Sequence, residues 1–131
     1  ALALEREVDF KYSGFDVDRK AIAIAKENAK MAGVDHLVEF HRQPFETLKK
    51  PVETGLLITN PPYGERIGYK DELIELYKNF AHLLKVEFKG WDCFVLSGDP
   101  ELSAEMRLKA THKYKVFNGP IECRLLRYKM F

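Results

Sequence analysis

The hydrophobic and polar positions of this chain change their spacing several times, from the period of a strand to that of a helix. Residues 12–18 predict a strand, and the alternating residues 37–41 predict a second one. Between them, residues 19–32 place apolar side chains on one helical face. Asp18 is suited to cap this helix, and Gly33 is suited to end it. The amino-terminal part therefore predicts a strand, a helix and a strand.

The carboxyl-terminal part continues the alternation and then changes to two consecutive strands. Its predicted elements are, in order, a loop or short helix around 44–51, a strand at 56–59, a helix that begins at 71 and ends at 89–90, a strand at 93–96, a short helix from 100 to about 110, and strands at 114–117 and 122–130. Asn118-Gly119-Pro120 predicts a hairpin turn between the last two strands. Residues 1–8 indicate only the tail of a helix.

This order of elements predicts an α/β fold with a mainly parallel sheet and an antiparallel edge strand. The 131 residues suffice for one domain, 1–131, and their 46% hydrophobic and 31% charged content is that of a globular protein. No run of about 18 apolar residues occurs, so no membrane span is expected. The first residues have no signal-peptide layout and no initiator methionine, which suggests that the chain starts inside a longer protein.

The formal net charge of +1 by itself predicts no polyanionic partner, but the charge is unevenly distributed. Residues 106–131 carry a basic stripe opposed by one acid, Glu122. Its members are Arg107, Lys109, Lys113, Lys115, Arg124, Arg127 and Lys129. Such a stripe suits a phosphate backbone, or it is a solvated strand face. Cys93 and Cys123 have no metal-ligand spacing, so we expect buried reduced thiols in the cytoplasm and no metal.

Residues 60–63, Asn-Pro-Pro-Tyr, follow directly on the predicted strand at 56–59. The two prolines cannot donate hydrogen bonds to a neighbouring strand, so the strand ends there. The residue before each proline is held in an extended conformation, which stiffens the loop. In open α/β sheets, ligands bind at the carboxyl ends of the strands. The loop is therefore the first candidate for a functional site.

The chemistry of this loop suits a nucleobase amine. The side-chain oxygen of Asn60 and the backbone carbonyl of Pro61 are two acceptors held side by side, because Pro62 supplies no donor. An exocyclic amine has two N–H donors, and holding both aims the nitrogen lone pair. Tyr63 offers a flat face for stacking, worth roughly 1–3 kcal/mol per base. The alternative is a proline-terminated strand with an incidental Asn and Tyr.

These residues resemble a known family. Residues 60–63 resemble the signature of amino-group methyltransferases that use S-adenosylmethionine. The longer stretch 60–68, NPPYGERIG, resembles the rRNA guanine-N2 methyltransferases, often described as N6-adenine-specific DNA methylases. Residues 88–91 and 113–121 extend the resemblance over almost the whole chain from about Tyr12. It implies a Rossmann-like methyltransferase fold, S-adenosylmethionine as cofactor, and catalytic roles for the four motif residues.

The resemblance also implies cofactor-binding residues. Asp16 ends the first predicted strand, where a carboxylate can accept hydrogen bonds from ribose hydroxyls; the alternative is a second helix-capping acid. The end of the next strand should meet the adenine, where the family often has an acid. Here Gln43 is expected to accept from the adenine amine instead, and Phe45 to cover the ring. Asn60 is the fourth residue expected to contact the cofactor, whereas His41 is expected on the strand surface.

A glycine-rich turn after the first strand is missing from the sequence. Two of the eight glycines, Gly64 and Gly68, follow a strand but belong to the substrate loop. The first strand and glycine-rich turn of the family would then lie before Ala1, so residues 1–131 are expected to be a partial catalytic domain, inactive and weak in cofactor binding alone. Arg66 is expected either to hold the loop or a substrate phosphate, or to form a surface ion pair.

Three functions follow from these expectations. The first is transfer of a methyl group from S-adenosylmethionine to guanine N2 in 23S rRNA, with the base turned out of its stack. The second is the same transfer to adenine N6 in DNA, since one motif serves both amines. The third is a non-catalytic domain that binds RNA or a partner through its basic edge. The first is favoured by the flanking matches.

Overall fold

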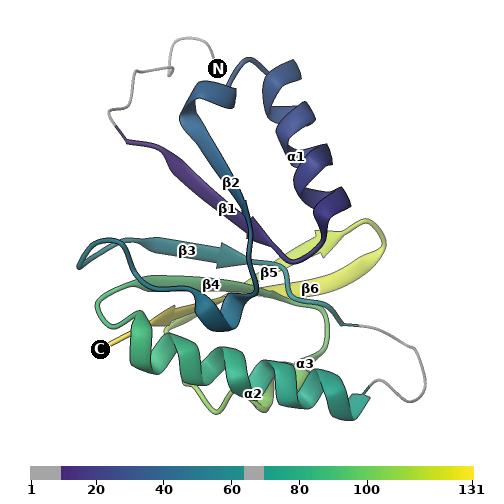
Figure 1. Ribbon diagram of the computed structural model, residues 1–131. Coiled ribbons are helices and arrows are strands. Elements are labelled where there is room, and N and C mark those ends of the chain that lie inside the picture. The colour runs from purple at the N-terminus through teal and green to yellow at the C-terminus, as the bar shows by residue number, and fades with distance from the viewer. Residues whose placement is uncertain (1–9, 64–69) are drawn as a thin grey trace. The chain divides into compact units, whose positions relative to one another are not determined.

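The computed structural model describes residues 10–63 and 70–131 (Figure 1). The chain divides into two compact units, residues 1–47 and 48–131. The helix tail predicted at residues 1–8 lies outside the described residues, as do Gly64, Arg66 and Gly68.

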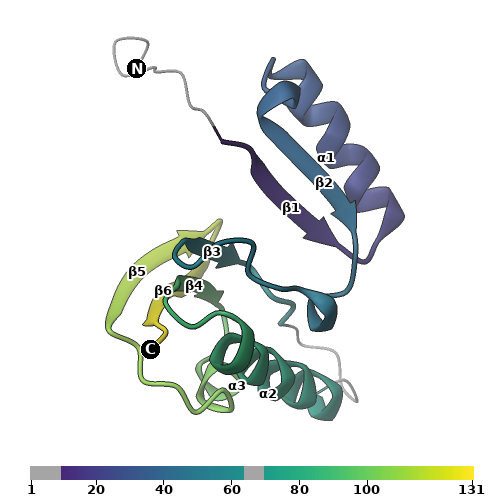
Figure 2. The same cartoon turned by 60° about the vertical axis from the view of Figure 1, so that its left-hand side comes forward.

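The first unit consists of a parallel strand pair and one helix. Its elements are β1 (Tyr12–Asp16), α1 (Arg19–Met31), the 3-10 turn η2 (Asp35–Leu37), β2 (Val38–Arg42) and the 3-10 turn η3 (Phe45–Thr47). The strands pair in parallel from Tyr12 opposite Val38 to Asp16 opposite Arg42. Helix α1 lies along this pair and contacts both strands (Figure 2). Its buried side chains, Ile22 and Ala29, belong to the apolar face expected from the sequence.

Asp18 fixes the start of α1. Its side chain accepts a hydrogen bond from the backbone N–H of Lys20 at 2.9 Å, which confirms the predicted cap. Because Val17 and Asp18 form the link into this cap, β1 ends at Asp16, two residues earlier than predicted. At the other end, Gly33 follows the last turn of α1 in the left-handed conformation, as predicted.

The second unit contains a four-stranded mixed sheet. Its elements are β3 (Leu56–Thr59), α2 (Lys70–Glu87), β4 (Asp92–Ser97), α3 (Pro100–Ala104), β5 (His112–Asn118) and β6 (Ile121–Lys129). The strand order is β3-β4-β6-β5, with β3 parallel to β4 and β6 antiparallel to both of its neighbours. The predicted combination of parallel strands and an antiparallel terminal hairpin is confirmed. The last strand lies inside the sheet, and β5 forms its edge.

The core of the second unit lies between α2 and one face of the sheet. Every second residue of β4 is buried, and Cys93 and Val95 are fully so. Helix α2 supplies a stripe of buried side chains to this core: Tyr77, Phe80, Ala81, Leu83 and Leu84. Both cysteines are free and buried, as predicted. None of the helices in the described part of the chain is long and apolar enough to cross a membrane.

The hairpin between β5 and β6 is tighter than the predicted three-residue turn. Asn118 pairs with Ile121, which leaves Gly119 and Pro120 as a two-residue loop. Gly119 has a φ of 61°, which a short hairpin loop requires and which glycine adopts without steric cost.

Helix α3 was predicted too long. It ends at Ala104 rather than near residue 110. The N–H groups of Met106 and Arg107 bond to carbonyls three residues earlier, which tightens the chain into turns. Arg107 then adopts a φ of 51°, which a right-handed helix cannot contain.

Candidate active site

The Asn-Pro-Pro-Tyr loop begins directly at the carboxyl end of β3. Thr59 is the last residue paired with β4, and Asn60 follows it. Asn60 is exposed, Pro61 is buried and Tyr63 is half-buried. The loop therefore leaves the sheet where the sequence predicted, with the asparagine side chain open to solvent.

Helix α2 holds the Asn-Pro-Pro-Tyr loop through a hydrogen bond. Tyr77 is only 1% exposed, and its hydroxyl donates a hydrogen bond to the carbonyl of Pro62 at 3.0 Å. Among the described residues, neither the carbonyl of Pro61 nor the side chain of Asn60 has a hydrogen-bond partner. The arrangement thus leaves in place the two acceptors that the sequence suggested. The anchoring role of Tyr77 was missed, because its position in an apolar helical stripe predicts only packing.

The burial of Tyr77 and Cys93 predicts a loss of stability at alkaline pH. Burial raises the pKa of the Tyr77 phenol to about 12, helped by the charge of Asp99, and that of the Cys93 thiol to about 12, helped by Asp92. Both groups are neutral in the fold and ionise more easily when unfolded. Their stabilising contribution is complete below about pH 9 and is lost as the pH rises to about 12.

Urea unfolding at pH 8 and pH 11 is expected to show a fall in the free energy of unfolding on the order of 2 kcal/mol. Tyr77→Phe is the matched variant, because it removes the phenol but keeps the ring. Its fall between the two pH values should be smaller than that of the unmodified chain. An equal fall in both proteins would show that Tyr77 has no part in it.

Tyr63 is held at two places. Its ring lies against Gly98, the residue after β4, so closely that a Cβ on Gly98 would overlap the ring. Its hydroxyl accepts a hydrogen bond from the side-chain amide of Asn118 at 3.3 Å and lies 3.9 Å from the Sγ of Cys123. One face of the ring is therefore occupied by the protein, and the phenol end is fixed by the β5–β6 hairpin.

The first unit brings together Asp16 and Gln43, two of the predicted cofactor-binding residues. The backbone N–H of Gln43 donates to the carbonyl of Asp16 at 2.9 Å, so both residues lie at the carboxyl end of the β1–β2 pair. One carboxylate oxygen of Asp16 accepts from the N–H of Asp18 at 2.8 Å. The side-chain nitrogen of Gln43 donates a hydrogen bond to the carbonyl of Thr47 at 3.2 Å. The side-chain oxygen of Gln43 therefore remains as an acceptor.

The donor and acceptor pattern at this edge fits the groups expected to bind there. The second carboxylate oxygen of Asp16 suits a ribose hydroxyl, and the side-chain oxygen of Gln43 suits an adenine amine. Phe45 is half-buried at the start of η3, next in the chain to these groups. The ribose and adenine roles remain predictions, as does the contact between Asn60 and the cofactor.

The comparison with known families decides the family of this chain. The model of the RMKL-like, methyltransferase domain family matches residues 2–127. The chain belongs to this family. The resemblance of the sequence to a methyltransferase family is thereby confirmed.

The curated relatives that match this RMKL-like chain are ribosomal RNA methyltransferases by name. It is 45% identical over 119 residues to the ribosomal RNA large subunit methyltransferase K/L of Syntrophotalea carbinolica, which covers 88% of the chain and 17% of that protein. It is 42% identical over 125 residues to the protein of the same name from Shewanella baltica, covering 95% of the chain and 18% of that protein. The chain thus spans less than a fifth of the length of these relatives.

Solved structures confirm the predicted methyltransferase fold. A possible methylase from Clostridium difficile 630 superimposes with a TM-score of 0.88 at 36% identity, over 96% of this chain and 33% of that one. SMU.472, solved in complex with SAH, gives a TM-score of 0.88 at 28% identity, over 97% of this chain and 33% of that one.

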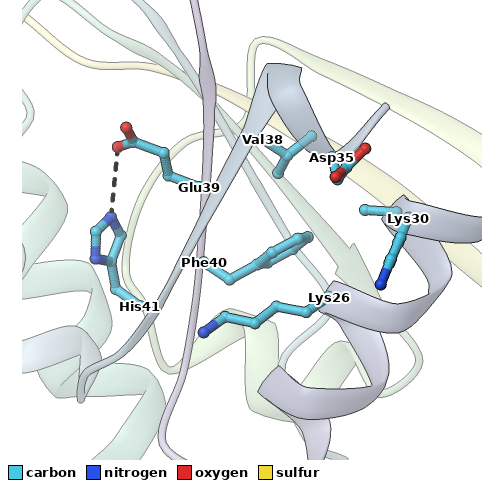
Figure 3. Close-up of a pocket in the computed structure, with 8 residues that line it drawn as sticks. Lys26, Lys30, Asp35, Val38, Glu39, Phe40 and His41 are labelled. Atoms are coloured by element: carbon cyan, nitrogen blue, oxygen red, sulfur yellow. Dashed lines mark ion pairs between the residues drawn. The ribbon is translucent and has the colours of Figure 1, made fainter. Parts of the chain in front are cut away.

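A hollow of about 540 Å³ lies between α1 and β2, and none of its lining residues is a predicted site residue (Figure 3). Phe40 and Val38 point toward α1, whereas Glu39 and His41 point to the other side of β2. His41 is exposed and forms an ion pair with Glu39 at 3.7 Å. It is therefore a strand-surface residue, as predicted. Within the described residues, no cluster of His, Cys, Asp or Glu is suited to hold a metal.

The predicted basic stripe is partly neutralised. Glu122 pairs with Lys115 at 2.8 Å and with Arg124 at 3.6 Å, and Asp92 pairs with Arg127 at 3.0 Å. The hydrogen bond and charge of Lys115 hold the pKa of Glu122 below its usual value. Four members of the stripe have no acidic partner among the described residues: Arg107, Lys109, Lys113 and Lys129. A phosphate-binding role therefore depends on fewer charges than the sequence suggested.

Proposed function

We propose that the complete gene product that carries this chain transfers a methyl group from S-adenosylmethionine to an exocyclic amine of a nucleobase in ribosomal RNA. The observation that carries the proposal is the loop after β3, where Asn60 and Pro61 keep two acceptors unoccupied among the described residues while Tyr77 binds the next carbonyl. The names of the curated relatives support ribosomal RNA as substrate, and the SAH complex of SMU.472 supports the cofactor.

Each site residue then has a defined task. The side-chain oxygen of Asn60 and the carbonyl of Pro61 accept from the two N–H groups of the target amine, which aims the nitrogen lone pair. Pro62 stiffens the loop, and Tyr63 contacts the base through its ring. S-adenosylmethionine supplies an activated methyl group. Since the residues act mainly by positioning, no strong general base is required before transfer.

The cofactor tasks fall to the first unit. Asp16 accepts from the ribose hydroxyls through its second carboxylate oxygen, and Gln43 accepts from the adenine amine. Phe45 covers the adenine ring. The sequence of these 131 residues contains no glycine-rich turn after a strand. The chain alone is therefore expected to bind the cofactor weakly and to transfer no methyl group.

More specifically, we propose that the methylated amine is N2 of a guanine in 23S rRNA and that the reaction takes place in the cytoplasm. The test incubates the complete gene product with S-adenosylmethionine and, separately, with unmodified 23S rRNA and DNA, then digests each to nucleosides for mass spectrometry. N2-methylguanosine from the RNA is the expected product. N6-methyladenine from the DNA would support the adenine alternative instead. RNA binding without any methylated nucleoside would refute transfer and leave the non-catalytic alternative.

A further inference from the structure

We propose that Asn118 is a positioning residue that orients the Tyr63 ring for the target base, an inference that rests on the proposed function. The residue lies 55 positions from Tyr63 in the sequence, and its side-chain amide donates to the Tyr63 hydroxyl at 3.3 Å. The hairpin meets the same hydroxyl at a second point, the Sγ of Cys123 at 3.9 Å, but the bond from Asn118 is the shorter of the two.

The hairpin is a rigid base for this hydrogen bond. Asn118 is the last residue of β5 and pairs with Ile121 across the two-residue loop. Strand β6 in turn pairs with β4, the strand next to β3. The position of the amide is therefore fixed by two rows of strand pairing. A side chain on a mobile loop would not offer the same precision.

The two contacts of Tyr63 restrict different motions. Gly98 lies under the ring and sets its height, because any larger side chain there would overlap it. The hydrogen bond from Asn118 holds the hydroxyl end of the ring and resists its sideways displacement over Gly98. The thiol of Cys123, at 3.9 Å from the same hydroxyl, is a weak hydrogen-bonding group and cannot replace the amide. Without the Asn118 side chain, the Tyr63 ring would keep its contact with Gly98 but lose the hydrogen bond that orients it.

A double-mutant cycle in the complete gene product tests this role. Asn118→Ala and Tyr63→Phe each remove one partner of the hydrogen bond. Each is expected to lower kcat for methyl transfer roughly two- to tenfold and to leave the KM for S-adenosylmethionine unchanged. In the Tyr63→Phe background, Asn118→Ala should cause no further loss. Asn79→Ala, the same change at an exposed position of α2, should leave kcat unchanged.

A second measurement does not depend on activity. Ring-labelled tyrosine in the complete gene product gives an NMR signal for Tyr63, assigned by its loss in Tyr63→Phe. Asn118→Ala should shift this signal, because the hydroxyl loses its donor, whereas Asn79→Ala should not.

The outcomes separate the two proposals. An unchanged Tyr63 signal in Asn118→Ala would overturn the positioning role. Losses in kcat that simply add in the double variant would overturn it too, because they would show that Asn118 acts elsewhere. If the unmodified protein methylates no nucleobase, the proposed function fails, while the NMR result still decides whether Asn118 orients the ring.

Discussion

Replacement of Asn60 with alanine is expected to abolish methyl transfer by the complete gene product, with a fall in kcat of about 100-fold or more. The variant removes one of the two acceptors that we propose hold the target amine, and a misplaced reacting group alone can cost about 100-fold. Cofactor affinity, measured by calorimetric titration with S-adenosylmethionine, should stay nearly intact. Because Asn60 is exposed and has no hydrogen-bond partner among the described residues, the free energy of unfolding should change by less than about 0.5 kcal/mol.

Two controls make this result specific. Asn79→Ala repeats the substitution on the exposed face of α2 and should retain full activity. Asn60→Asp keeps an acceptor oxygen at the same place and should retain more activity than Asn60→Ala. Loss of cofactor binding in parallel with activity would contradict the role of Asn60 at the target amine, and would instead support the contact with the cofactor that the sequence also predicts for Asn60.

The local features of this fold were predictable because they depend on neighbouring residues. The cap at Asp18 and the end of β3 at the two prolines follow from backbone chemistry within a few positions. The placement of Asp16 and Gln43 at one edge also follows, because parallel strands end at the same side of a sheet. Periodicity and capping therefore predicted the elements and the edge at which the candidate residues lie.

The contacts that hold the loop could not be predicted, because they join distant parts of the chain. Tyr77 appeared as one apolar residue of a helical stripe, and nothing in its neighbours indicates the hydrogen bond to Pro62. Gly98 appeared only as part of a turn. The available signal was its position directly after a buried strand, at the same edge as the motif. A glycine there indicates close approach of another group, which the structure identifies as the Tyr63 ring.

Helix α3 shows where local signals mislead. Pro100 correctly predicted its start, and the structure adds a cap there, the side chain of Asp99. Its end was predicted near residue 110, and no glycine or proline between residues 101 and 118 indicates an earlier one. The structure ends it by burial instead, since Met106 is only 1% exposed and the chain turns tightly on both sides of it. Burial of a single side chain is a tertiary effect that leaves no periodic signal.

The substitution Gly98→Ala should lower kcat for methyl transfer roughly 10- to 100-fold, although Gly98 itself contacts no substrate. The added methyl group would overlap the Tyr63 ring, so the ring must move from the position in which we propose that it contacts the target base. The same overlap is expected to lower the free energy of unfolding by about 1–3 kcal/mol. Steady-state kinetics and urea unfolding measure the two effects.

The Tyr63→Ala background provides the control for this prediction. With the ring removed, the methyl group of Gly98→Ala has room, so the second substitution should cost little further activity or stability. A double variant that loses as much again would contradict the argument, because it would show that Gly98 is required for the backbone of the turn after β4. Additive losses would therefore indicate that the backbone of the turn requires glycine, whereas non-additive losses would indicate that Gly98 is needed to make room for the Tyr63 ring.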